Sequence, residues 1–410
     1  MRTHFLLASA AALALAGCGS GAERSDNRGT AEAEAVQWNG GLERQLLEAL
    51  EGAPNHGLTR DLFLQGELPS GDADRNRALT RIALDYASAL ARGKTDPTKL
   101  RSVYTVPRPD VDLAAGLRQA MADNKLREWL DSLAPQSEEY RLLGQAFVAL
   151  VQPPPGQPGS DTSETRERAR QLAVAMERLR WLDRNPPATR IDVNTAAATL
   201  DYWRDGQRLG ERRVVVGEPG WETPQLGSPI FQLVANPSWN VPESIEEAEL
   251  SKKPASYFRE QNIIRKDGRY VQLPGPKNAL GEVKFDMKND HAIYLHDTPA
   301  KALFAEPERH ESHGCVRVDG ALDFARELAL ADGVLEEFEE ALASGDETFV
   351  SLKQQIPVRL MYHTAFLGPD GRIRFAPDVY GWDNDVAAAL GYETRPRPKV
   401  EHRAGEDVGP

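Results

Sequence analysis

The spacing of apolar residues along the chain changes once, from a helical period to a strand period. Between residues 37 and 185, apolar residues recur every three or four positions, as at Leu42, Leu46 and Leu50. Such spacing puts apolar side chains on one face of a helix. A Pro-, Gly- and Ser-rich stretch at residues 152–163 interrupts the pattern and predicts a linker between two helices. We therefore expect a helical scaffold domain over residues 37–185.

From residue 188 onward apolar and polar residues alternate, in segments such as 190–194, 198–203 and 211–216. Alternation with a period of two is typical of strands that bury one face. We therefore predict a mainly β domain over residues 188–364, followed by a C-terminal extension at residues 365–410. The fold class is α+β, with the helical domain first and the sheet domain second.

One stretch inside the predicted sheet domain has neither period. Residues 241–287 are rich in charge, glycine and proline. Loops of this length within a compact domain are usually functional lids or disordered segments. We treat the stretch as an inserted segment, and an inert surface excursion is the alternative.

Residues 1–17 have the layout of a secretory signal, with a basic residue before an apolar run. The apolar run is too short to span a bilayer. Leu-Ala-Gly-Cys at residues 15–18 is similar to the lipobox of bacterial lipoproteins, which implies that Cys18 is lipidated. An ordinary signal peptide with a chance cysteine is the alternative. Residues 18–36 are small and polar and predict a flexible tether. We expect a periplasmic protein held by its lipid, and by analogy with known sorting rules Gly19 favours the outer membrane.

Composition narrows the class of protein. At 410 residues, with 40% hydrophobic and 7% aromatic residues, the chain is long enough for two soluble domains. Its formal charge is −13, and no basic footprint for phosphate binding is visible. Nucleic acid is therefore not an expected partner.

The chain has two cysteines, and if Cys18 is acylated then Cys315 has no intrachain partner. A lone thiol in an oxidising compartment risks unwanted disulfides, so its presence indicates chemistry rather than a structural bridge. A buried structural cysteine is the alternative. A thiol nucleophile needs a nearby base and backbone N–H groups that stabilise the developing oxyanion.

The sequence around Cys315 offers both. Tyr294 and His296 occupy alternate positions of a predicted strand and so face the same side. His296 is therefore the predicted base. Gly314 permits a tight turn, so the N–H groups of Gly314 and Cys315 are the expected oxyanion donors. We predict a Cys–His acyl-transfer site.

The same residues carry a resemblance to a known family. His296, fifteen intervening residues and Ser-His-Gly-Cys-Val-Arg at residues 312–317 resemble the signature of the L,D-transpeptidase family, whose catalytic domain is of the YkuD type. Residues 236–242 and 293–301 resemble the large YcbB-type branch of that family, found in Gram-negative envelopes. The resemblance implies that the inserted segment caps the active site, that carbapenems acylate the enzyme and that no cofactor is required.

By this resemblance the substrates are peptidoglycan stem peptides. Cys315 would attack the amide between diaminopimelate and the terminal D-alanine of a donor, and the amine of a second diaminopimelate would resolve the thioester into a cross-link. If water attacked the thioester instead, the enzyme would be an L,D-carboxypeptidase. If another amine attacked it, the enzyme would be a lipoprotein-anchoring transpeptidase. A non-catalytic wall-tethering lipoprotein is the rival from another class, although it would need neither His296 nor Cys315. The sequence names no protein partner.

More than one role is open for several of the remaining site residues. His313 and Ser312 belong to the same motif, and we assign them supporting roles, which for His313 means orientation of the thiolate or a contact to substrate. Arg317 either binds a stem-peptide carboxylate, favours the thiolate or forms a structural ion pair. Trp239 and Tyr294 are either walls of the cleft or sheet core.

Two further histidines, His291 and His310, lie near the motif and are taken as solvated or supporting groups. A zinc site is the rival of the acyl-transfer site. The spacing of His310, His313 and Cys315 does not fit the paired ligands of structural zinc modules, so we expect no metal.

Overall fold

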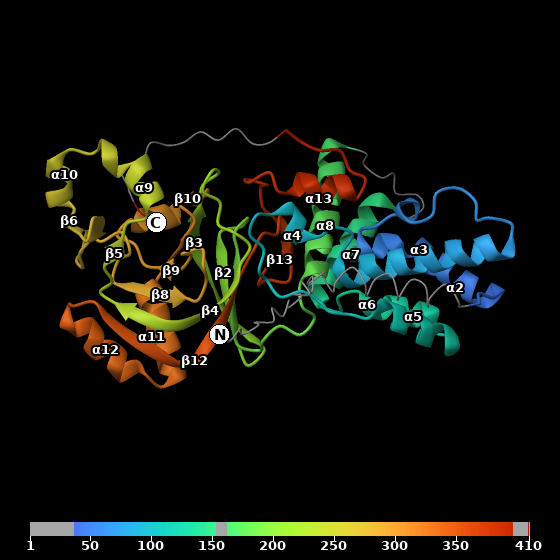
Figure 1. The fold of residues 1–410 in the computed structure, drawn as a ribbon, viewed down its shortest axis with the longest axis horizontal. Helices are drawn as coiled ribbons and strands as arrows, with labels where there is room; N and C mark the ends of the chain where they lie inside the picture. The colour runs from blue at the N-terminus through green and yellow to red at the C-terminus, as the bar shows by residue number, and fades with distance from the viewer. Residues whose placement is uncertain (1–36, 153–161, 397–408, 410) are drawn as a thin grey trace, which may run out of the picture.

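The protein has two lobes that lie end to end along its long axis, one helical and one built on a β-sheet (Figure 1). The computed structural model describes residues 37–152, 162–396 and 409. The predicted signal and tether, Cys18 with them, and most of the predicted linker lie outside these residues. The helical lobe comes first and the mainly β lobe second, which confirms the predicted α+β class.

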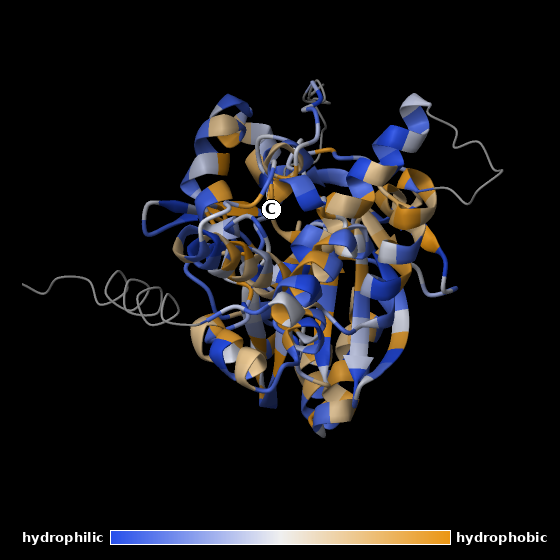
Figure 2. Cartoon of the chain, turned by 90° about the vertical axis from the view of Figure 1, so that its right-hand side faces the viewer, coloured by the Kyte–Doolittle hydropathy of each residue, from blue (hydrophilic) through white to orange (hydrophobic). Residues whose placement is uncertain are grey.

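Helices form the first lobe, and several begin where a side chain accepts hydrogen bonds from free backbone N–H groups, as Asn39, Ser137 and Thr162 do. Figure 2 shows hydrophilic and hydrophobic residues side by side on the helices that face the viewer. Leu46 and Leu50 are fully buried, as their helical spacing predicted. The elements are α2 (Gly40–Glu51), η1 (Ala53–His56), η2 (Arg60–Leu62), α3 (Asp72–Arg92), α4 (Pro97–Leu100), α5 (Leu113–Ala122), α6 (Leu126–Leu133), α7 (Glu138–Val151) and α8 (Ser163–Trp181).

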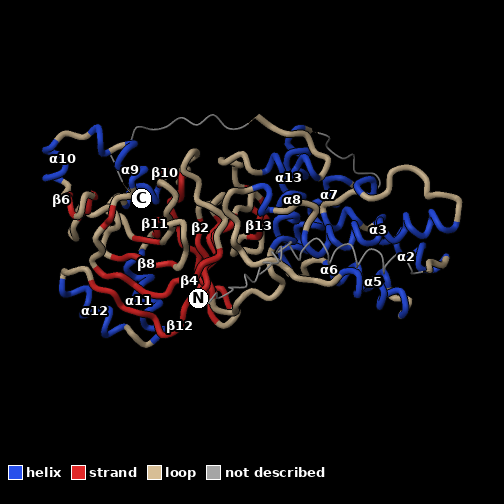
Figure 3. Tube along the Cα trace, in the orientation of Figure 1, coloured by secondary structure: helices blue, strands red, loops and turns tan. Residues whose placement is uncertain are grey.

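The second lobe is organised around a β-sheet (Figure 3). Its nine strands, all within the described residues, follow the order β10-β3-β11-β9-β8-β4-β12-β1-β2. Because β2 also pairs with β3, the sheet closes on itself. The strands are β1 (Arg190–Asn194), β2 (Thr199–Arg204), β3 (Gln207–Gly217), β4 (Gly227–Ala235), β8 (Val283–Met287), β9 (Leu295–His296), β10 (His310–Ser312), β11 (Val316–Val318) and β12 (Thr348–Met361). The predicted hairpin of β2 and β3 is confirmed.

Alternation along the central strands divides their side chains between a core and a site. Leu295, Val316 and Val318 are fully buried in a core that they share with Phe324 and Phe338. These two aromatic residues come from α11 (Ala321–Asp332) and α12 (Leu335–Ser344), which pack on the sheet. Residues one position away along the same strands therefore project from the other face.

The inserted segment folds into a small subdomain, which we call the cap. It contains β5 (Trp239–Asn240), α9 (Glu243–Ala248), η3 (Leu250–Lys252), α10 (Ala255–Glu260), β6 (Ile263–Lys266) and β7 (Arg269–Gln272). Ile245 and Leu250 are buried with Trp239 in a core of its own. The cap ends before the predicted residue 287, because β8 pairs with β4 within the main sheet.

Residues 365–390 return to the helical lobe instead of forming a separate extension. They contain β13 (Ala365–Leu367), β14 (Ile373–Phe375) and α13 (Asp383–Ala389). Ala365 and Val386 are buried in the core of the helical lobe. Arg178 of α8 pairs with Asp383 at 2.5 Å, and both side chains are buried. The two lobes are therefore joined by residues 365–390 as well as by the connection after α8.

Candidate active site

Two neighbouring strands bring the predicted catalytic residues to one face of the sheet. β9 and β11 run parallel, with His296 beside Arg317 in register. Because their neighbours in sequence point into the core, these two side chains project from the opposite face. Tyr294 and Cys315 each lie two positions earlier and share that face. The rings of Tyr294 and His296 are 5.6 Å apart, which confirms the prediction that they point to the same side.

The strand before His296 is shorter than predicted, since β9 starts only at Leu295. Ala292 has a φ of +54°, in the left-handed region that favours glycine, and this conformation interrupts the strand. The Cys315 sulfur lies 3.6 Å from the Ala292 carbonyl oxygen. The chain at Ala292 thus bends away from the sheet where it borders the thiol.

A glycine turn presents Cys315. Gly314 has a φ of +109°, which residues with a side chain rarely adopt. The Ser312 hydroxyl donates to the Cys315 carbonyl oxygen at 2.6 Å and accepts from the Gly314 N–H at 3.2 Å. Ser312 therefore supports the turn. The oxyanion role of the Gly314 N–H stays a prediction, and it would require this N–H to leave Ser312.

Two residues that the sequence did not single out brace the same turn. The Thr223 hydroxyl donates to the Gly314 carbonyl oxygen at 2.9 Å and accepts from the Gly217 N–H at 2.9 Å. The Tyr380 hydroxyl donates to the Gly217 carbonyl oxygen at 2.6 Å. Thr223 contacts the turn directly and Tyr380 supports it through Gly217. Both come from distant parts of the chain, so no motif spacing could have revealed them.

The Cys315 thiol is buried and protonated at neutral pH. Burial raises its pKa to about 11, although hydrogen bonds from Tyr294 and the charges of Lys284 and Arg317 act in the opposite direction. The residue is 4% exposed. A thiol in this state needs a base at the moment of attack, because the thiolate is the nucleophile.

His296 has the tautomer that such a base requires. Its Nδ1 lies 2.5 Å from the Asp297 carbonyl oxygen, and since a carbonyl only accepts, Nδ1 carries the proton. Among the described residues Nε2 has no hydrogen-bond partner. Burial and then the charge of Arg317 hold the pKa of His296 well below its ordinary value. The imidazole is therefore neutral, with a lone pair on Nε2 that can accept a proton.

Arg317 and His313 stand two residues to either side of Cys315 and both are buried or nearly so. Arg317 is 1% exposed, and its charge lowers the pKa of Cys315 and of His296. It thus favours the thiolate, which is one of the roles predicted for it. His313 faces the cap, where its Nε2 lies 2.7 Å from Glu249 Oε1 at the end of α9.

Trp239 and Tyr294 connect the cap with the site. Trp239 is 1% exposed and belongs to the core of the cap, and the half-buried Tyr294 packs against this core. Tyr294 also hydrogen-bonds to the sulfur of Cys315. The core alternative therefore fits Trp239, whereas Tyr294 is part of the site.

The other two histidines lie apart from the thiol in their contacts. His291 is exposed, and His310 is half-buried with Nε2 2.9 Å from the Thr195 carbonyl oxygen. Within the described residues, no three His, Cys, Asp or Glu side chains gather as a metal site would need. In the same part of the chain, no helix combines the length and the apolar character of a membrane span.

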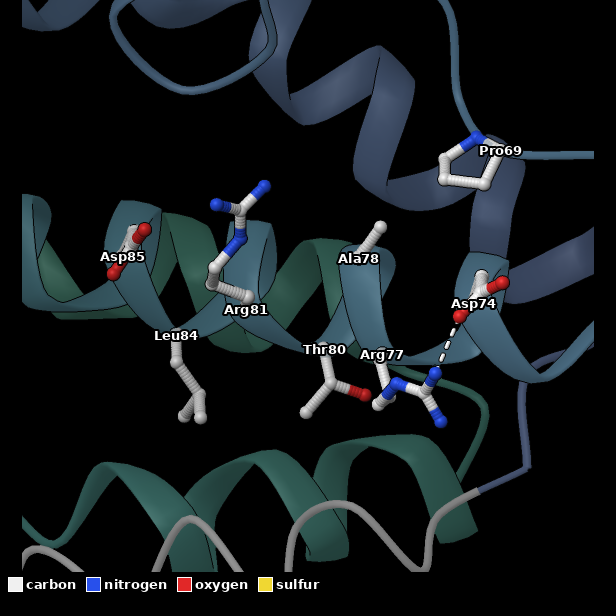
Figure 4. Close-up of a pocket in the computed structure, with 8 residues that line it drawn as sticks. All are labelled: Pro69, Asp74, Arg77, Ala78, Thr80, Arg81, Leu84 and Asp85. Atoms are coloured by element: carbon white, nitrogen blue, oxygen red, sulfur yellow. Dashed lines mark hydrogen bonds and ion pairs between the residues drawn. The ribbon is translucent and has the colours of Figure 1, made fainter.

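A cavity of about 600 Å³ lies on α3 in the helical lobe (Figure 4). Asp74 and Arg77 form an ion pair at its wall. Its lining contains no cysteine or histidine and consists of Pro69, Asp74, Arg77, Ala78, Thr80, Arg81, Leu84 and Asp85. This cavity brings no thiol together with an imidazole, whereas the face of the sheet around Cys315 does, so that face is the candidate active site.

Comparison with known proteins finds a family model for each lobe. Residues 188–335 match the model of the YkuD L,D-transpeptidase catalytic domain, and residues 34–147 match a model described as a scaffold domain. A protein of Haemophilus influenzae named "Putative L,D-transpeptidase" is 32% identical over 311 residues, which cover 70% of this chain and 61% of the relative. The chain thus spans about three-fifths of the length of that relative.

Two solved structures are also similar. The catalytic domain of the Enterococcus faecium L,D-transpeptidase acylated by ertapenem is 14% identical, over 43% of this chain and 99% of that chain, with a TM-score of 0.24. The L,D-transpeptidase from Mycobacterium smegmatis is 15% identical, over 42% of this chain and 58% of that chain, with a TM-score of 0.24. From the matched model, residues 188–335 of this chain form a catalytic domain of the YkuD L,D-transpeptidase family.

Proposed function

We propose that this protein cross-links peptidoglycan stem peptides through a thioester on Cys315. The observation that carries the proposal is the shared face of β9 and β11, which groups a thiol, a neutral imidazole and a guanidinium. These three groups supply a nucleophile, a base and a positive charge, which are the parts that acyl transfer requires.

In the first step Cys315 Sγ attacks the carbonyl carbon of the amide between diaminopimelate and the terminal D-alanine. His296 Nε2 accepts the thiol proton as the S–C bond forms, because its Nδ1 is already committed to the Asp297 carbonyl. The C–N bond then breaks, the proton passes to the leaving nitrogen, and D-alanine departs. The enzyme is left as a thioester.

In the second step the side-chain amine of another diaminopimelate attacks the thioester carbon. An amide forms, the S–C bond breaks, and the proton released by the amine returns to sulfur through His296. One amide is exchanged for another, so the reaction needs no nucleotide and no other source of energy.

The products of purified protein with a disaccharide-tetrapeptide test this proposal. We expect mass spectrometry to find free D-alanine and a dimer joined between two diaminopimelate residues, and neither with Cys315→Ala. Tripeptide without dimer would replace the proposal by L,D-carboxypeptidase activity. Unchanged tetrapeptide, with a folded protein, would refute acyl transfer from this substrate.

We also propose that Cys18 carries a lipid that holds the protein in the outer membrane, facing the periplasm. The support is the Leu-Ala-Gly-Cys sequence after a short apolar run, together with peptidoglycan as the proposed substrate. A lipid anchor and a tether at residues 18–36 would keep the catalytic lobe within reach of the wall.

A further inference from the structure

A second cavity, of about 330 Å³, lies between the sheet and the hairpin of β13 and β14, and we call it the interlobe cavity. Its walls come from the turn before β2, from β3, from the segment that leads into β10 and from the hairpin. Its volume is at the lower end of the range for small-molecule sites. Cys315 and His296 are not among its lining residues, so it is distinct from the candidate active site.

The imidazole of His310 lines this cavity and leaves one nitrogen without a partner. The side chain is 6% exposed, and Nε2 lies 2.9 Å from the Thr195 carbonyl oxygen, which only accepts, so Nε2 carries the proton. Among the described residues Nδ1 has no hydrogen-bond partner, and Glu308 Oε2, 3.7 Å away, is a second acceptor. Burial lowers the pKa of His310 to about 4, so the ring is neutral at neutral pH. A ligand that fits this wall must therefore bring a hydrogen-bond donor to Nδ1.

The positive charges on the wall are already engaged. Arg213 pairs with Asp319 at 2.8 Å, and Arg374 pairs with Glu211 at 3.5 Å. Arg309, the third arginine among the described lining residues, donates to four backbone carbonyl oxygens. An anion would have to displace one of these partners, so a neutral ligand fits the cavity better.

An exposed aromatic ring completes the cavity. Phe375 is 38% exposed, and the Arg168 guanidinium of α8, 5.4 Å from its ring centroid, holds the ring from the helical lobe. The C–H bonds of a sugar pack on such a ring, and sugar hydroxyls both donate and accept hydrogen bonds. A sugar therefore supplies the apolar face for Phe375 and the donors for His310 and Glu308.

The interlobe cavity lies on the same face of the sheet as the thiol. Arg317 pairs with Val215 across β11 and β3. Arg213 lies two positions from Val215 and so shares the face of Arg317 and Cys315. The Asp319 N–H donates to the Arg213 carbonyl oxygen, which places Arg213 four strand residues, about 13 Å, from Cys315. Three extended residues of a stem peptide span about 10 Å, so a sugar in the cavity and an amide at the thiol can belong to one molecule.

We propose that the interlobe cavity binds one sugar ring of a glycan strand, and that this ring carries the stem peptide whose amide Cys315 attacks. The inference rests on the proposed function, because peptidoglycan joins the sugar to the stem peptide. His310 and Glu308 accept hydrogen bonds from hydroxyls of the ring, and Phe375 packs against its C–H bonds. The cavity thus selects donors that are still attached to glycan over free stem peptides.

Calorimetric titration with a tetramer of β-1,4-linked N-acetylglucosamine tests the sugar site without a stem peptide. We expect the full chain to bind the tetramer and Phe375→Ala to bind it about tenfold more weakly. Phe349→Ala is the matched control, because Phe349 is 56% exposed and outside the cavity, and it should bind like the wild type. Glu308→Ala changes an exposed residue and should also weaken binding about tenfold, with Glu306→Ala as its control.

A second readout reports on His310 itself. The Nδ1 resonance of His310 in the ¹⁵N spectrum, assigned by its loss in His310→Gln, should move upfield when the tetramer is added, because this nitrogen then accepts a hydrogen bond. No binding, equal binding by wild type, Phe375→Ala and Glu308→Ala, or an unshifted Nδ1 resonance with the tetramer bound would overturn the sugar site. Displacement of the tetramer by free stem tetrapeptide would assign the cavity to peptide instead.

Product analysis separates this inference from the proposed function. Dimer formed from the disaccharide-tetrapeptide without binding of the tetramer would keep the proposed function and overturn the sugar site. Tetramer binding that depends on Phe375, with neither D-alanine nor dimer from the wild type, would keep the sugar site and overturn the proposed function. If both are right, Phe375→Ala should raise KM for the disaccharide-tetrapeptide about tenfold and leave kcat nearly unchanged.

Discussion

Replacing His296 by alanine should remove the base while leaving the thiol in place. With a pKa of about 11, about one Cys315 thiol in ten thousand is ionised at pH 7. A positioned general base contributes about 10² to 10⁴ in rate, and the ionised fraction sets a similar upper limit to the loss. His296→Ala should therefore lower the acylation rate at pH 7 by about a hundredfold to ten-thousandfold.

The pH dependence gives the prediction its second readout. The pKa of His296 lies well below its ordinary value, so the neutral base is present at pH 6 to 8 and the wild-type rate should be nearly flat there. In His296→Ala only the free thiolate can react, so its rate should rise about tenfold per pH unit until the thiol pKa is reached.

Stopped-flow acylation by a carbapenem measures both readouts, and the appearance of one adduct per chain follows by mass spectrometry. His291→Ala is the matched control, because His291 is exposed and outside the site. His313→Ala should keep a measurable fraction of the rate. A flat pH profile in His296→Ala together with loss of acylation in His313→Ala would refute the assignment and reverse the two roles.

Three further substitutions test other parts of the account. Tyr294→Phe removes a hydrogen bond that favours the thiolate, so the pKa of Cys315 should rise and iodoacetamide labelling at pH 8 should slow about tenfold; an unchanged pH profile would exclude this role. Thr223→Val removes both hydrogen bonds that brace the Gly314 turn and should lower the free energy of unfolding by about 1–3 kcal/mol in urea titration; an unchanged midpoint would contradict it. Cys18→Ala should move the protein from the membrane fraction to the soluble fraction, and unchanged fractionation would mean that the anchor lies elsewhere.

Short-range patterns in the sequence predicted the parts of the structure that short-range physics decides. Alternation placed Tyr294 and His296 on one side, and their rings lie 5.6 Å apart on the face opposite the core. Helical spacing predicted the buried leucines of α2. The family resemblance is confirmed by the two matched models, which also fit the predicted order of domains.

The parts that the sequence did not predict depend on contacts between distant segments. The sequence predicts a C-terminal extension after residue 364, yet Ala365 and Val386 are part of the core of the helical lobe. Thr223 and Tyr380 brace the catalytic turn from outside the motif. Glu249 lies in the inserted segment, whose charge and glycine content did not predict α9 or the contact of Glu249 with His313.

The mass of the intact protein after brief exposure to a disaccharide-tetrapeptide tests the central claim most directly. We predict that the wild-type chain gains the mass of the donor without its terminal D-alanine, one acyl group per chain, and that the modified residue is Cys315. The Cys315→Ala variant should gain nothing. An adduct of the same mass on Cys315→Ala, or its location on any other residue of the wild type, would contradict the account.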